Sequence, residues 1–176
     1  MNPATDSATE APDVTPDVAK QQSEFVQDML SRRNIPQRTP RWYETRGRML
    51  TASDVAAAIG VNKYTSRAQL LKRKTEGSSF SGNAATAWGQ KYEDVAIAEY
   101  ERRTGEVVHD CGLFVHEGLA WLGGSPDGLT NSGKLIEVKC PYKRPLENFV
   151  PAHYMPQVQT CLEICNVEQC DFIQVL

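Results

Sequence analysis

The sequence GSPDGLTNSGKLIEVKCP, residues 124–141, is the most informative stretch of the chain. It joins a Pro-Asp-Gly turn to a short segment in which charged and apolar residues alternate, as they do in a strand. Successive side chains of a strand point to opposite faces, so Glu137 and Lys139 are expected on one face and Ile136 and Val138 on the other. Charged side chains in so apolar a strand are costly unless they have partners or a chemical role.

Residue periodicity on either side of this stretch predicts the other elements. Helical spacing and helix start and stop signals predict helices over 17–33, 53–59, 66–74, 84–103 and 152–165. Alternation predicts strands over 107–109, 113–116, 119–123, 135–139 and 171–176. Residues 34–40 and 77–83 are expected to break the helices that precede them. This order predicts an α/β fold of the α+β type, with a central mixed sheet flanked by helices.

Length and composition limit the domain organisation. The chain has 176 residues, of which 40% are hydrophobic, enough for one domain with a real core. Residues 1–16 contain no aromatic residue and are predicted to be a disordered acidic tail before a single domain over 17–176. We find no apolar run of the length that a membrane helix needs and no secretion signal, so we expect an intracellular protein of the cytoplasm or nucleus.

The charges are segregated along the chain. Residues 32–74 hold eleven Lys and Arg residues against two acids, a balance of +9, whereas residues 75–176 have a balance of −7. A basic block followed by an acidic block suggests one part that binds an anion and another that gathers cations, although a solvated basic helix would look the same.

Three carboxylates stand out as candidate metal ligands. Glu93 interrupts the apolar face of the helix predicted over 84–103. With Asp127, Glu137 and the carbonyl of Val138 it offers the oxygen ligands that Mg²⁺ prefers. Each feature alone has an ordinary explanation as a turn, a surface ion pair or a partly exposed acid. Together they indicate metal-assisted hydrolysis of a phosphodiester, in which Lys139 would either orient or deprotonate the attacking water or stabilise the reacting phosphate.

Residues 124–127 with 137–139 match the PD-(D/E)xK nuclease pattern. The chain most resembles the lambda exonuclease branch, the YqaJ-type viral recombinase family, over about residues 42–176. The resemblance rests on segments that occur in the same order as in the family: WYETRGRMLTAS (42–53), AWGQKYE (87–93), SPDGL (125–129), EVKCP (137–141) and YMPQVQ (154–159). It implies a restriction-endonuclease-like core.

The resemblance also implies roles for single residues. Asp127 and Glu137 would ligate the metal, Glu93 would be a nearby or water-mediated acid, and Lys139 would be the catalytic lysine. Gln157 would help to place Lys139 or the attacking water.

Binding of the DNA 5′-phosphate is the role that the resemblance implies for Arg46 and Ser53. Two physical arguments agree with it. Arg46 offers a guanidinium fork to phosphate. Ser53 lies at a predicted helix start, where free N–H groups favour an anion, although a plain helix cap would also place a serine there.

The function expected from this resemblance is a 5′→3′ exonuclease that degrades one strand of linear duplex DNA and leaves 3′ single strands for recombination. Mg²⁺ is the expected cofactor, with Mn²⁺ as an alternative. The expected partners are double-stranded DNA ends and a single-strand annealing protein, and no membrane. Relatives form ring trimers. Because the chain ends at Leu176, before the strand and helix by which family members usually continue, homo-oligomerisation stays open here.

Two other functions remain open at this point: a structure-specific or restriction-type endonuclease, and a non-catalytic module that binds DNA ends. The resemblance also suggests a viral or phage origin. An iron–sulfur cluster on Cys140, Cys161, Cys165 and Cys170 is not favoured, because their spacing differs from that of common metal sites. Three histidines, His109, His116 and His153, lack metal-ligand spacing and are interpreted as ordinary polar residues.

Overall fold

The computed structural model describes residues 16–32, 35–77, 84–142 and 145–175. The elements in chain order are α1 (Pro16–Arg32), α2 (Pro40–Gly47), β1 (Leu50–Thr51), α3 (Ala52–Ala58), α4 (Arg67–Glu76), α5 (Ala84–Thr104), β2 (Val108–His109), β3 (Phe114–Val115), β4 (Leu122–Gly124), β5 (Gly128–Thr130), β6 (Leu135–Lys139), α6 (Met155–Cys165) and β7 (Cys170–Gln174). Residues 1–15 of the predicted tail and most of the loop expected over 77–83 lie outside the described residues.

The strands form two mixed sheets. In the first, β4 lies between β1, to which it is parallel, and β3, to which it is antiparallel. In the second, β5 is antiparallel to β2 and β6, and β7 is parallel to β6. A parallel pair needs a crossover, which α6 supplies between β6 and β7. The predicted α/β class with mixed strand pairing and flanking helices is confirmed, but the strands divide between two sheets where one central sheet was predicted.

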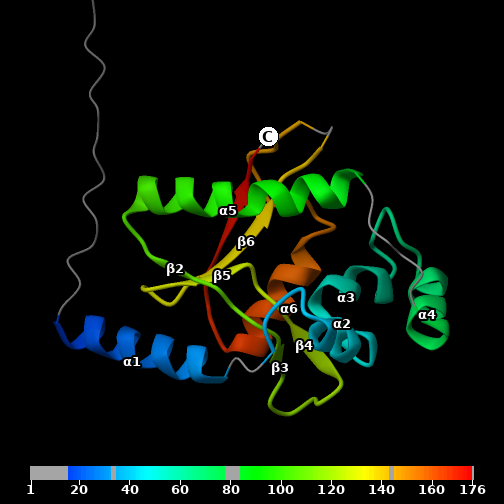
Figure 1. Ribbon diagram of the computed structural model, residues 1–176, viewed down its shortest axis with the longest axis horizontal. Coiled ribbons are helices and arrows are strands. Elements are labelled where there is room, and N and C mark those ends of the chain that lie inside the picture. The colour runs from blue at the N-terminus through cyan, green and yellow to red at the C-terminus, as the bar shows by residue number, and fades with distance from the viewer. Residues whose placement is uncertain (1–15, 33–34, 78–83, 143–144, 176) are drawn as a thin grey trace, which may run out of the picture.

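Strand β6 packs on both faces. Ile136 and Val138 are buried with Ala96 of α5, whereas Leu135 joins a second cluster with Ile164 of α6. In Figure 1, α5 lies at the top of the view, α1 and α6 lie lower, and β5, β6 and β7 run between them. This burial confirms that Ile136 and Val138 share one face of the strand, as the alternation predicts.

Helix α1 closes the α6 side of the core. Its buried residues Val26 and Met29 belong to the same cluster as Leu135, with Phe25 and Leu30 packed against it. The spacing of these four residues of α1 is the apolar stripe that the sequence predicts, so this helix docks through one face.

The largest difference from the sequence prediction is α2, a helix that was not predicted; the break expected over 34–40 ends at its first residue, Pro40. Thr39 is the N-cap of this helix, and its hydroxyl accepts a hydrogen bond from the Trp42 N–H over 3.2 Å. Pro40 follows in the first turn, where a missing N–H costs nothing and the fixed φ favours a helix. The proline that was interpreted as a breaker therefore starts a helix, and this helix carries Arg46.

Smaller differences concern the ends of elements. Residues 119–121 form a turn rather than the start of a strand, and β4 covers only Leu122–Gly124. Residues 152–154 also form a turn, because Pro156 belongs to the first turn of α6. The short strands β1 and β5 were not predicted, since runs of two or three residues carry no detectable alternation.

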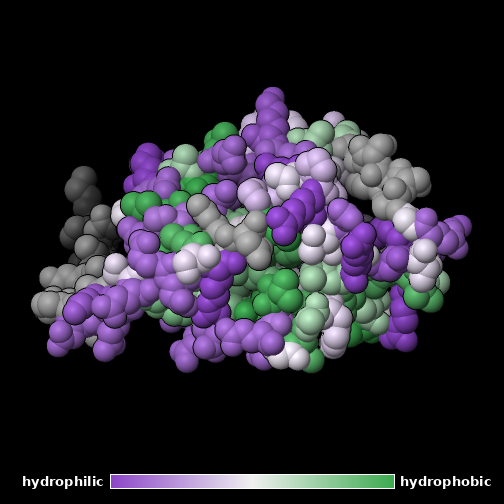
Figure 2. Space-filling view, turned by 60° about the horizontal axis from the view of Figure 1, so that its bottom comes forward, coloured by the Kyte–Doolittle hydropathy of each residue, from purple (hydrophilic) through white to green (hydrophobic). Residues whose placement is uncertain are grey.

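The surface is polar with scattered apolar side chains. Hydrophilic side chains predominate on the face shown in Figure 2, with smaller hydrophobic areas between them. Among the helices that the structure describes, none has both the length and the apolar composition needed to cross a bilayer.

Candidate active site

Strand β6 places Glu137 and Lys139 beside the first turn of α6. Glu137 is only 2% exposed, and its Oε1 forms an ion pair with the Lys139 ammonium. From α6, Gln157 donates a hydrogen bond from Nε2 to the same oxygen over 2.5 Å. The resemblance implied that Gln157 helps to place Lys139 or a water; its partner here is Glu137, the carboxylate that also pairs with Lys139. These contacts fix the orientation of the buried carboxylate.

Asp127 lies between β4 and β5 and is held against β6 by two hydrogen bonds. Its backbone N–H donates to the Ile136 carbonyl over 3.0 Å, and its Oδ2 accepts from the Val138 N–H over 2.7 Å. The carboxylate therefore lies next to the strand that carries Glu137, as the two motifs predicted.

Glu93 of α5 is the third predicted carboxylate. It lines a cavity of about 390 Å³ together with Asp127, and its Oε1 accepts a hydrogen bond from Nη2 of Arg38 over 2.7 Å. Burial raises the pKa of Glu93, the Asp127 carboxylate acts in the same direction, and Arg38 opposes them. Glu93 thus faces the same cavity as Asp127, but it is held by an arginine that the sequence analysis did not consider.

The electrostatics of the group are dominated by negative charge. Burial raises the pKa of Glu137, Asp127 and Glu93 add to this rise, and Lys139 opposes it. Burial also disfavours the charged form of Lys139, but Glu137 and Asp127 outweigh this and raise the lysine's pKa. Lys139 therefore stays protonated. Among the described residues, the cationic partners of the three carboxylates are one ammonium, that of Lys139, and one guanidinium, that of Arg38.

This donor set fits a hard divalent cation. The carboxylates of Asp127 and Glu137 and the Val138 carbonyl are oxygen ligands, and a cation beside Glu137 would offset the cost of its burial. Within the described part of the chain, no group of three or more His, Cys, Asp or Glu side chains is arranged to hold a metal alone. Mg²⁺ keeps several waters when it binds protein, so a complete cage of side chains is not required.

A smaller hollow of about 150 Å³ adjoins these carboxylates. Arg46, Ser53 and Trp42 line it together with Asp127 and Gln157. Nη2 of Arg46 donates to the Ser53 hydroxyl over 3.0 Å, and the guanidinium carbon lies 4.2 Å from the centre of the Trp42 ring. Burial lowers the pKa of Arg46, but a guanidinium remains charged at any physiological pH. The hollow therefore combines a fixed positive charge with a hydroxyl group.

Thr51, not Ser53, occupies the N-cap position of α3. Ser53 lies in the first turn with an exposed side chain, so its hydroxyl is not used as a helix cap. Trp42, which was quoted only as part of a motif, joins α2 to the loop before Asp127, because its indole N–H donates to the Ser125 hydroxyl over 2.9 Å.

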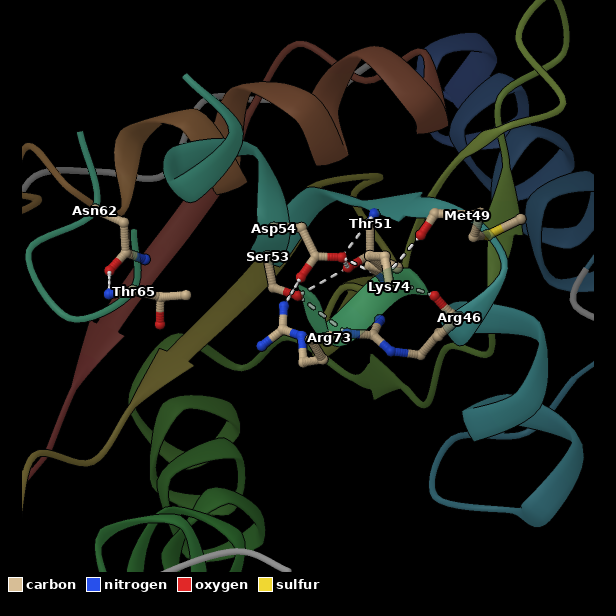
Figure 3. A network of polar contacts seen from close by, with 9 residues as sticks. All are labelled: Arg46, Met49, Thr51, Ser53, Asp54, Asn62, Thr65, Arg73 and Lys74. Carbon is tan, nitrogen blue, oxygen red and sulfur yellow. Dashed lines mark hydrogen bonds and ion pairs between the residues drawn. The ribbon is translucent and has the colours of Figure 1, made fainter. Parts of the chain in front are cut away.

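A network of contacts around one buried carboxylate, that of Asp54, connects the elements that carry Arg46 and Ser53. Asp54 accepts hydrogen bonds from the N–H and hydroxyl of Thr51 and forms ion pairs with Arg73 and Lys74 of α4 (Figure 3). Nζ of Lys74 also donates to the main-chain carbonyl of Arg46 over 2.8 Å. Burial alone would raise the pKa of Asp54, but the bonds from Lys74 and Thr51 outweigh it, so the pKa is lowered. The network joins α4 to α3 and α2.

The cysteines are thiols in apolar surroundings. Cys161 and Cys165 are buried on α6, and burial raises the pKa of both, to about 12 for Cys165. Burial also raises the pKa of Cys170 to about 12. Thiols of such high pKa are poor nucleophiles at neutral pH.

The model of the YqaJ-like viral recombinase domain matches residues 41–168. An uncharacterised protein of Acanthamoeba polyphaga mimivirus is 29% identical over 157 residues, which cover 78% of this chain and 29% of the viral protein. A protein of African swine fever virus is 28% identical over 160 residues, which cover 73% of this chain and 46% of the relative. The chain thus spans less than half of these viral relatives.

Among solved structures, an alkaline exonuclease from Laribacter hongkongensis is similar, with a TM-score of 0.62 and 33% sequence identity over 77% of this chain and 73% of the exonuclease. The structure of this exonuclease in complex with dAMP matches equally well, with a TM-score of 0.62, 32% identity, and coverage of 78% of this chain and 74% of that one.

Proposed function

The chain belongs to the YqaJ-like viral recombinase domain family, and from this premise we propose that it is a Mg²⁺-dependent deoxyribonuclease that degrades one strand of linear duplex DNA from its 5′ end. A similar solved structure is that of an alkaline exonuclease, and its complex with dAMP shows that this relative accommodates a mononucleotide. A mononucleotide is the product that an exonuclease releases.

One observation carries the choice of an exonuclease. The Arg46–Ser53 pair lines the same small hollow as Asp127 and Gln157. A terminal 5′-phosphate, which carries more charge than a phosphodiester, is a suitable ligand for this arginine and hydroxyl. With the end held there, the first phosphodiester of the strand would lie at the carboxylates. The distance between the Arg46–Ser53 pair and the carboxylates would then determine which phosphodiester is hydrolysed once the end is bound.

The residues divide the chemistry among them. Asp127, Glu137 and the Val138 carbonyl would hold the metal, and Glu93 would contribute through a water. A bound Mg²⁺ supplies Lewis-acid polarisation of the phosphodiester and lowers the pKa of a coordinated water. Lys139, which is protonated, would stabilise the negative charge that develops on the reacting phosphate.

The wider assignments follow from the same proposal. We assign a single domain to residues 17–176, with double-stranded DNA ends as its substrate and a single-strand annealing protein as a partner for the 3′ strands it leaves. The matched proteins of mimivirus and African swine fever virus support a viral origin. Mn²⁺ is expected to replace Mg²⁺, because both accept oxygen ligands.

The test is a time course with 5′- or 3′-end-labelled linear duplex, with and without a 5′-phosphate, and with nicked and closed circles of the same sequence. We expect Mg²⁺-dependent release of 5′ mononucleotides from linear DNA, faster with a 5′-phosphate, while closed circles stay intact. Internal cuts in closed circles would instead establish an endonuclease. Binding of ends without cleavage in Mg²⁺ or Mn²⁺ would establish a non-catalytic module.

A further inference from the structure

The larger of the two hollows has a lining that the proposed function leaves unexplained. Five carboxylates line this cavity of about 390 Å³: Glu93, Asp94, Glu101, Asp110 and Asp127. Arg38 is the one basic residue among the described residues of the lining. Such a surface repels DNA except where a cation is present. The position of Arg38 therefore decides where a phosphate could enter.

The backbone around Arg38 is held in an unusual conformation. Its φ is 63°, in the left-handed region that residues other than glycine and asparagine seldom adopt. Before it, Gln37 donates two hydrogen bonds from Nε2, to the carbonyl of Cys111 over 2.9 Å and to that of Pro126 over 3.0 Å. After it, Thr39 caps α2. Strained backbone that the surrounding contacts enforce is concentrated at functional sites.

The Arg38 side chain is only partly used by its contacts. Nη2 donates to Glu93, and the side chain is 40% exposed. A guanidinium has five N–H donors in a planar fork, so the remaining donors can bind two oxygens of a phosphate while the bond to Glu93 persists. The bonds of Gln37 place this fork beside the loop that carries Asp127.

Asp127 lines both hollows, so it lies between Arg46 on one side and Arg38 on the other. Resting on the proposed function, we propose that Arg38 forms a second phosphate subsite, which binds the phosphodiester on the 3′ side of the scissile one in the degraded strand. The terminal phosphate, the scissile linkage and the next linkage would then occupy Arg46, the carboxylates and Arg38 in that order.

The experiment neutralises one linkage at a time. Three 5′-phosphorylated duplexes are compared: unmodified, with a methylphosphonate at the second linkage from the 5′ end, and with a methylphosphonate deep inside the same strand. Affinities are measured in Ca²⁺, on DNA shown to remain intact. The wild-type protein is expected to bind the second-linkage duplex roughly tenfold more weakly than the unmodified one, and the internally modified duplex normally.

The Arg38→Ala variant is expected to bind unmodified DNA as weakly as the wild type binds the second-linkage duplex, and to bind the second-linkage duplex no more weakly still. Arg38→Lys should keep part of the difference in affinity between these two duplexes. Arg38→Gly, which tolerates the positive φ, separates a lost contact from backbone strain: it should bind as weakly as Arg38→Ala and melt at a temperature no lower than that of Arg38→Ala. Arg48→Ala is the matched control, because Arg48 pairs with Glu44 over 2.7 Å but lines neither hollow.

Equal affinity of the wild-type protein for the unmodified and second-linkage duplexes would reject the subsite. So would an Arg38→Ala variant whose affinity falls as much as that of the wild type when the second linkage is neutralised. These binding measurements do not require turnover. A protein that shows the linkage effect in Ca²⁺ but never cleaves in Mg²⁺ would refute the proposed nuclease and retain the subsite.

Discussion

Replacing Asp54 by asparagine tests whether its ion pairs with Arg73 and Lys74, next to the Arg46–Ser53 pair, contribute to the free energy of unfolding. The Asp54 side chain is 6% exposed, and removing one partner of a fully buried pair costs about 3–5 kcal/mol. Arg73 and Lys74 keep 40% and 22% of their side chains exposed, so water can solvate them partly after the change. We therefore expect a loss of about 2–3 kcal/mol in unfolding free energy, or a melting temperature lower by about 5–10 °C.

The pH dependence of this loss follows from the lowered pKa of Asp54. A carboxyl whose folded-state pKa is depressed stabilises the fold above its unfolded-state pKa, about 3.9, and the stabilisation disappears as pH falls through the folded-state pKa. The difference between wild type and Asp54→Asn should therefore be complete at neutral pH and should shrink below about pH 4.

Urea unfolding followed by tryptophan fluorescence measures this difference at pH 7 and at acidic pH. Asp28→Asn is the matched control, because Asp28 forms an ion pair with Arg32 over 2.8 Å with 59% of its side chain exposed. This control should cost at most about 1 kcal/mol. An Asp54→Asn variant that is no more destabilised than Asp28→Asn at pH 7, or whose loss is unchanged at acidic pH, would refute the stabilising role of these ion pairs.

The other predictions concern the proposed chemistry. Glu137→Gln and Asp127→Asn should each abolish Mg²⁺-dependent cleavage without changing the circular dichroism spectrum, because each removes an anionic ligand; near wild-type turnover in excess Mg²⁺ would reject the metal assignment. Lys139→Ala should lose most of its single-turnover rate and keep its DNA affinity, since the charge of Lys139 acts mainly in the transition state. A loss of affinity with an unchanged single-turnover rate would make Lys139 a binding residue. Arg46→Ala should reduce the preference for 5′-phosphorylated over 5′-hydroxyl ends, whereas Lys72→Ala should slow both alike; equal losses with Arg46→Ala would contradict end recognition.

Those parts of the fold that depend on local pattern could be predicted from the sequence. Strand β6 has the predicted bounds, and the burial of Ile136 and Val138 against α5 follows from a period of two. The apolar stripe of α1 follows in the same way from a period of 3.6. The adjacency of Asp127 and Glu137 could be anticipated because a short turn and two short strands connect them.

The partners of charged residues could not be predicted in this way. Arg38 and Glu93 are 55 positions apart, and Trp42 and Ser125 are 83 apart. No periodicity relates such pairs, which are set by how α2 and α5 pack around the sheets. The start of α2 was missed for a different reason. Thr39 followed by Pro40 is a helix start signal, but the proline alone was interpreted as a stop.

The basic block shows why a count of charges is not a count of DNA contacts. Residues 32–74 carry a balance of +9, but the structure uses several of these cations internally. Arg73 and Lys74 pair with Asp54, and Arg38 pairs with Glu93. A cation that already neutralises a buried carboxylate releases fewer counterions from DNA than a free one, so it adds little to the salt dependence of binding. Among the residues that the structure describes, Arg38 alone combines such a pair with a position on the larger hollow. The donors that its bond to Glu93 does not use are those assigned to the proposed substrate contact.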